Sequence, residues 1–157
     1  MRISAMPVVL LSFLALTTAD NNHKPRGCNP KAKGPTLEKD QQAAMADFAK
    51  LLLIDNKPIV AYDKYVPGQY IQHNPFAQSG REFSLNFLTE ARAQGWRSDK
   101  LTFFAGQGYG FTHIRAFWQN TTSSVMDYFR FEGTCIVEHW DVVQVITGNE
   151  TNPIAFF

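Results

Sequence analysis

Residues 125–144 read VMDYFRFEGTCIVEHWDVVQ and contain two runs that are rich in aromatic and β-branched side chains. These runs, Val125–Phe131 and Cys135–Val145, are separated by the segment EGT at 132–134, a composition typical of a tight turn. The stretch therefore predicts a β-hairpin.

Two aspartates lie on this hairpin among apolar neighbours. Side chains alternate between the faces of a strand, so Asp127 shares a face with Phe129, and Asp141 shares one with His139. A carboxylate on an apolar face is costly unless it is paired or hydrogen-bonded, and proteins build acid/base catalysts in such environments. The alternative is a solvent-facing position on an edge strand, which applies to Asp127 more than to Asp141.

The composition indicates one globular domain. The chain has 157 residues, 45% of them hydrophobic, which suffices for one well-packed core and is short for two. The formal net charge is +1 with Lys and Arg scattered along the chain, so no nucleic-acid partner is expected.

The first nineteen residues have the pattern of a secretory signal peptide. Met1-Arg2 supplies a positive start, residues 8–16 an apolar run, and residues 17–19 a small-residue cleavage site. Residues 20–35 form a basic, Pro- and Gly-rich arm, and residues 36–157 form the domain. We expect a secreted protein whose mature form does not enter a membrane.

Two further features are typical of secreted proteins. Asn120 and Asn149 each begin an N-glycosylation pattern in an expected loop. Cys28 and Cys135 are the only cysteines, and one disulfide between them would tie the arm to the hairpin. Two free thiols remain the alternative, because the sequence gives no distance between them.

The order of the elements predicts an α+β domain. Thr36 is expected to cap a helix that ends before Asp55, Pro58 to open a second helix, and Ser79 to cap a third. Extended segments are expected at 70–73, 101–105 and 110–118, before the hairpin. Helices followed by an antiparallel sheet indicate a curved sheet that wraps over the helices. The glycines at 106, 108 and 110 are read as a strand turn, not as a phosphate loop.

A polar group of side chains could gather on one face of this sheet. In the strand 110–118, His113 and Arg115 share a face and require partners, for which the hairpin aspartates are candidates. If the faces agree, one cavity would be lined by His73, His113, Arg115, Asp127, His139 and Asp141. Such a group suits removal of a proton from carbon beside a carbonyl, which requires neither a metal nor an organic cofactor.

The hairpin also carries a family resemblance. DYFRFEGTCIVEHWDVVQ at 127–144 is similar to the closing strands of the SnoaL-like polyketide-cyclase family, and YIQHNP at 70–75 matches a second family segment in the expected order. The resemblance covers roughly residues 37–147. It implies a cone-shaped α+β barrel of the nuclear-transport-factor type, with a ligand cavity between sheet and helices, and intramolecular aldol chemistry with an acid/base aspartate.

The group of polar residues and the family resemblance together suggest a role for each residue of the predicted site. Asp141 is the expected base, His73 and His139 polarise the substrate, and Asp127 is the second catalytic carboxylate. Substrate binding is assigned to Tyr70, His113, Arg115 and Phe129. The expected ligand is a small, apolar, carbonyl-containing molecule, with a homodimer left open.

Other functions remain open at this stage. The fold also serves secreted proteins that only bind small molecules, and fold does not settle function. An Asp127-Arg115-Asp141 group could instead open epoxides. A metal site made of His73, His113, His139 and Asp141 uses legitimate ligands but has no recognised local spacing.

Overall fold

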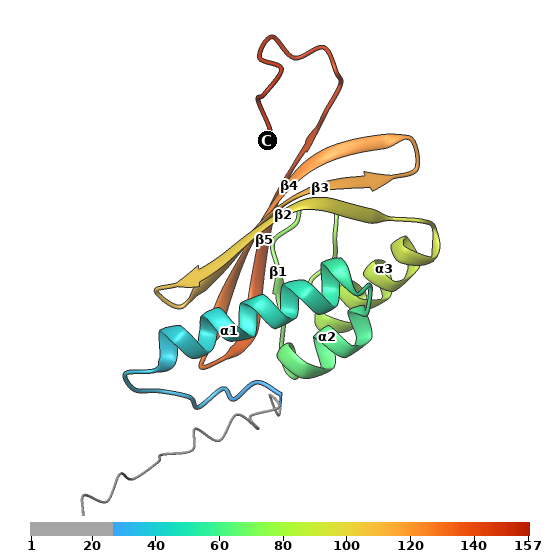
Figure 1. Ribbon diagram of the computed structural model, residues 1–157. Helices are drawn as coiled ribbons and strands as arrows, with labels where there is room; N and C mark the ends of the chain where they lie inside the picture. The colour runs from blue at the N-terminus through green and yellow to red at the C-terminus, as the bar shows by residue number, and fades with distance from the viewer. Residues whose placement is uncertain (1–26) are drawn as a thin grey trace, which may run out of the picture.

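The structure is a computed structural model that describes residues 27–157. Three α-helices pack on one side of a five-stranded sheet (Figure 1). The predicted signal peptide and the first part of the arm lie outside the described residues. Among residues 27–157, no helix has both the length and the apolar character required to cross a membrane.

The helices follow the sequence pattern closely. They are α1 (Leu37–Ala49), its π-helical continuation η1 (Lys50–Ile54), α2 (Pro58–Tyr65) and α3 (Arg81–Ala93). Thr36 precedes α1 as expected, but its side chain makes no capping hydrogen bond. The cap expected from Ser79 is wrong, because Gly80 precedes α3. Ser79 Oγ instead accepts a hydrogen bond from Gln72 N at 3.1 Å, which holds the loop between them.

The sheet is open. Its strands are β1 (Ile71–Gln72), β2 (Arg97–Gly106), β3 (Tyr109–Trp118), β4 (Thr121–Glu132) and β5 (Cys135–Val145), in the order β1-β5-β4-β3-β2. Only the β1–β5 pair is parallel. The α+β prediction is confirmed, but the sheet does not close into a barrel, because β1 and β2 lie at opposite edges and do not pair.

The face of the sheet that the helices cover, here called the inner face, forms the core. Phe48 of α1 packs edge-on against Phe129 of β4, with ring centroids 5.5 Å apart. Gly110 of β3 lies beneath Met45, where a Cβ would collide with the sulfur, so glycine permits α1 to approach the sheet. The opposite face, called the outer face, carries Tyr128 and Trp140.

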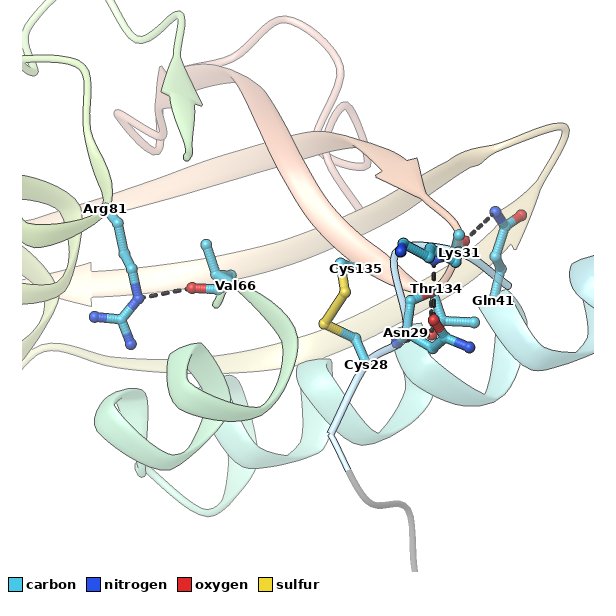
Figure 2. The surroundings of a disulfide bond; sticks show 9 residues. Cys28, Asn29, Lys31, Gln41, Val66, Arg81, Thr134 and Cys135 are labelled. Atoms are coloured by element: carbon cyan, nitrogen blue, oxygen red, sulfur yellow. Dashed lines mark hydrogen bonds between the residues drawn. A yellow bond between two sulfur atoms is a disulfide. The ribbon is translucent and has the colours of Figure 1, made fainter. Parts of the chain in front are cut away.

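The predicted disulfide is present (Figure 2). Cys28 and Cys135 are bonded, with their Cα atoms 4.9 Å apart. Asn29 and Thr134 reinforce this junction, since Thr134 N donates to Asn29 O at 3.0 Å and Asn29 N donates to Thr134 Oγ1 at 2.8 Å. The described end of the arm is thus fixed to the β4–β5 turn, as expected.

Candidate active site

A row of polar side chains crosses three strands on the inner face. Thr112 of β3 pairs in register with Asp127 of β4, which pairs with Asp141 of β5. Directly opposed residues of antiparallel strands have Cβ atoms about 4.5–5.5 Å apart, so the two carboxylates face each other. The two aspartates that the sequence singled out therefore occupy one site.

His139 binds one of these carboxylates and is held from both ring nitrogens. Its Nε2 lies 3.1 Å from Asp127 Oδ1, and its Nδ1 lies 2.8 Å from Gln72 Oε1. Gln72 Oε1 also accepts the backbone N–H of Asn74 at 3.1 Å, which identifies this atom as the amide oxygen. Nδ1 must therefore carry a proton. Thr112 Oγ1 lies 2.5 Å from Asp127 Oδ2 and donates to it.

This bonding pattern requires a further proton in the Asp127–His139 pair. Because Nδ1 of His139 is already a donor, the Nε2 contact with Asp127 Oδ1 is a hydrogen bond only if one of the two atoms is protonated. The pair is then an imidazolium beside a carboxylate, or an imidazole beside a carboxylic acid. Either form places a transferable proton on the inner face.

Asp141 has a different environment. Asn74 Nδ2 donates to it, at 2.9 Å from Oδ1 and 2.7 Å from Oδ2. Asn74 Oδ1 accepts the backbone N–H of Phe76 at 2.6 Å, which fixes the orientation of the amide. A carboxylate has about four acceptor positions, so Asp141 keeps capacity for a further proton or donor. It is the better placed of the two aspartates to act as a base.

Two buried tyrosines cover this group. Tyr70 stacks on the ring of His139 at a centroid distance of 6.2 Å, and Tyr62 of α2 packs against Tyr70 at 5.8 Å. Burial raises the pKa of Tyr62 to about 12 and that of Tyr70 well above its usual value. Both hydroxyls therefore stay protonated over the physiological range. Phe129 stacks against His139 at 4.7 Å and so lies beside the site, and its role in substrate binding stays a prediction.

His73 does not belong to this group, so its predicted catalytic position is wrong. It stacks on Trp140 of the outer face at 4.6 Å, and its Nε2 lies 2.8 Å from Glu138 Oε1. Adjacent residues in an extended segment face apart, and here Gln72 and Asn74 take the inward positions. The family-like segment contributes to the site through Tyr70 and its two amides, Gln72 and Asn74, and not through its histidine.

His113 and Arg115 are also absent from the site. His113 Nε2 contacts Ser124 Oγ at 2.9 Å, and Arg115 forms an ion pair with Asp99 at 2.6 Å. Both side chains lie on the outer face, because Thr112 takes the inward position between Gly110 and Ile114. The Asp-Arg-Asp group and the metal set that were left open as alternatives are therefore divided between the two faces.

A different set of three residues could hold a metal ion. One ligand atom each from Asp127, His139 and Asp141 lies within 4.8 Å of the other two. Oxygen and imidazole nitrogen are suitable ligands for several divalent cations. Each of the three also has a protein partner, since His139 binds Asp127 and Asn74 binds Asp141, so the geometry does not require an ion.

Sequence reasoning missed the partners that orient the site. Thr112, Gln72 and Asn74 are short or neutral polar side chains, which carry less chemical signal than histidine or arginine. The alternation of side chains along β3 already placed Thr112 and His113 on opposite faces of the sheet. The sequence did not indicate which face of β3 lies beside Asp127, because this depends on the register of β3 against β4.

Comparison with known proteins gives structural similarity only. No family model matches the chain, and no curated protein matches it. Among solved structures, AclR from Streptomyces galilaeus, a proposed hydroxylase, superposes with a TM-score of 0.55 at 11% identity over 68% of this chain and 80% of AclR. TsrD from Streptomyces laurentii gives a TM-score of 0.48 at 14% identity over 65% of this chain and 89% of TsrD. The likeness to AclR supports the α+β fold.

Proposed function

We propose that this protein is a SnoaL-like enzyme that transfers protons without a cofactor, in an aldol cyclisation or isomerisation of a small apolar carbonyl compound. The observation that carries the proposal is the row in which Asp141 faces the Asp127–His139 pair on the helix-covered side of the sheet. The resemblance of segments 70–75 and 127–144 to polyketide cyclases, with their cone-shaped fold, supports the same reaction class.

In this mechanism Asp141 is the base. Its carboxylate removes a proton from the carbon beside a carbonyl, and the C–H electron pair forms the enolate. In a cyclisation the enolate carbon attacks a second carbonyl of the same molecule, and the new alkoxide receives the proton from Asp141. In an isomerisation Asp141 returns the proton to a different carbon.

The Asp127–His139 pair has an electrostatic role. In its imidazolium form, His139 is fixed by Gln72 and Asp127, and its charge stabilises the developing negative charge without having to reorient. Such preorganised charges and donors are usually the largest contribution to catalysis of this kind. Asn74 is a positioning residue, because it holds the carboxylate of Asp141 from both oxygens.

Exchange of carbon-bound hydrogen for deuterium tests the proposal without the natural substrate. We expect the wild type to accelerate this exchange in members of a panel of cyclic ketones and β-diketones. Asp141→Asn should abolish the acceleration, because it removes the proton acceptor at nearly constant size. Asp99→Asn, on the outer face, is the matched control. Ligand binding without exchange would instead indicate a non-catalytic binding protein.

We also propose that the protein is secreted and glycosylated. The Cys28–Cys135 disulfide supports an oxidising compartment, and the side chains of Asn120 and Asn149 are both exposed. Mass spectrometry of the protein from a secreting eukaryotic host should find a chain that begins near Asp20 with glycan on one of these asparagines. A chain that still begins at Met1 and carries no glycan would contradict secretion.

A further inference from the structure

A cavity of about 340 Å³ lies between the start of α2 and the end of α3, the two helices beneath the sheet in Figure 1. Pro58, Ile59 and Val60 of α2 supply its apolar wall, and Lys57 and Arg92 supply two cations. Among the described residues, none that lines the cavity is acidic or belongs to a strand. The cavity is therefore separate from the row of polar side chains on the inner face.

Arg92 has a fixed position in the wall of this cavity and lacks one partner. Its Nη2 donates to Leu52 O of η1 at 2.8 Å, and its guanidinium lies 3.5 Å from the centre of the Trp96 ring. Its Nη1 is buried and has no hydrogen-bond partner within residues 27–157. Burial lowers the pKa of Arg92 to about 10. Asp55, which ends η1, is already bound by Lys50 at 2.5 Å. A buried charged donor without an acceptor costs free energy, so an anion bound here would stabilise Arg92.

The start of α2 adds unpaired donors to the same cavity. The first turn of a helix leaves N–H groups without partners and carries a partial positive charge. Pro58 has no N–H, and the N–H of Ala61 donates to Lys57 O at 3.0 Å. The N–H groups of Ile59 and Val60 have no acceptor in the part of the chain that the structure describes, and no side chain caps this helix. The helix start thus adds to the positive charge of the two cationic side chains.

The composition of the wall restricts the ligand. Ile59 and Val60 are 53% and 48% exposed, so covering them with hydrocarbon would be favourable. A phosphate group is strongly hydrated and would lose water against this apolar wall, whereas a carboxylate on a hydrocarbon body matches both parts of the cavity. Nη1 of Arg92 is covered by neighbouring atoms, so exposed side chains such as Lys57 and Ile59 must move aside when the anion binds.

We propose that this cavity binds a small monocarboxylate with a hydrocarbon body. The carboxylate accepts hydrogen bonds from Arg92 and from the first N–H groups of α2, Lys57 adds its charge, and the hydrocarbon covers Ile59 and Val60. This site goes beyond the proposed proton-transfer function, because it uses no residue of the row on the inner face.

Calorimetric titration of the full chain with octanoate measures this binding. We expect saturable binding that neither octanol nor acetate reproduces, because octanol lacks the charge and acetate lacks the hydrocarbon body. Inorganic phosphate should not displace octanoate. Since Trp96 lies against Arg92, octanoate should also change the tryptophan fluorescence, and Trp96→Phe should remove that change. Octanol that binds as tightly as octanoate, or displacement by phosphate, would overturn the assignment of a carboxylate.

Variants locate the site. Arg92→Gln should weaken octanoate binding about tenfold or more, as for loss of a hydrogen bond to a charged group. Arg97→Gln is the matched control, because Arg97 also lies over an aromatic ring, that of Phe117 at 3.9 Å, but does not line the cavity. Lys57→Gln changes an exposed side chain, so it keeps the test valid if Arg92→Gln fails to fold. It should weaken binding about two- to fivefold.

Three results would overturn the proposal. The first is unchanged octanoate affinity in both Arg92→Gln and Lys57→Gln. The second is an altered affinity in Asp141→Asn, which would place the ligand in the row on the inner face. The third is binding of the protein to vesicles of phosphatidylcholine and phosphatidylserine through Ile59 and Val60 without any affinity for octanoate, which would identify the exposed residues as a membrane contact.

Discussion

Asp127 and Asp141 lie directly opposite each other on β4 and β5, on the face that the helices cover. Two like charges at this separation are unfavourable, and His139 offsets the repulsion by binding Asp127. The two carboxylates consequently differ in role, since Asp127 is engaged by His139 and Thr112, and Asp141 is bound by an uncharged amide.

This difference predicts unequal effects on stability. Asp127→Asn breaks the charged contact with His139 and should lower the free energy of unfolding by about 1–3 kcal/mol. Asp141→Asn removes the repulsion and should change it by less than about 1 kcal/mol. Urea unfolding of both variants measures the two values. A larger loss in Asp141→Asn would contradict the assigned hydrogen bonds.

The two middle residues of the segment QHNP should behave in opposite ways. Asn74→Ala frees the carboxylate of Asp141 and should reduce deuterium exchange roughly tenfold, since misplacement of a catalytic group is costly. His73→Ala should leave exchange unchanged, because His73 lies on the outer face against Trp140. Exchange rates measured under identical conditions decide this, and a strong loss in His73→Ala would restore the assignment made from sequence.

The disulfide should make a large contribution to stability. Cys28 and Cys135 are 107 residues apart, and closing a loop of this length is expected to stabilise by roughly 4–5 kcal/mol in the chain-entropy treatment. Cys28→Ser, Cys135→Ser and the double variant should lower the urea midpoint equally. Reductant should lower the midpoint of the wild type and leave that of the variants unchanged.

Glu138 should make stability depend on acid pH. Hydrogen bonds from His73 and Arg130 lower its pKa from the usual 4.5. Because the folded pKa is depressed, the associated stability is present above the unfolded pKa and is lost as pH falls through the folded value. The stability difference between the wild type and Glu138→Gln should therefore shrink below about pH 4.5. Glu132→Gln, at the exposed end of β4, is the control.

Tyr62 should make stability depend on alkaline pH. Burial raises its pKa from 10.0 to about 12. For a group with a raised folded pKa, the stability is complete below the unfolded pKa and is lost as pH rises through the folded value. Unfolding measured between pH 9 and 12 should show this decline more weakly in Tyr62→Phe. Tyrosinate absorbance at the same pH values should show that Tyr62 ionises late.

Much of the fold could be predicted from the sequence because its signals are local. The aromatic and β-branched runs with Gly133 between them form the β4–β5 hairpin, and Pro58 opens α2. Alternation places His139 and Asp141 on one face and Trp140 on the other. These are properties of neighbouring residues in the chain, so the sequence by itself determines them.

The active-site group was decided by tertiary structure. The register that pairs Thr112 with Asp127, and the packing of helices on that face, exclude His113 and Arg115. A shift of one residue would reverse every side chain of β3, and no local signal distinguishes the two registers. Tyr62 meets Tyr70 only because α2 folds against the segment that precedes β1, with the two ring centroids 5.8 Å apart. Which of the many polar residues come together in the site therefore depends on how segments that are distant in the sequence pack against one another.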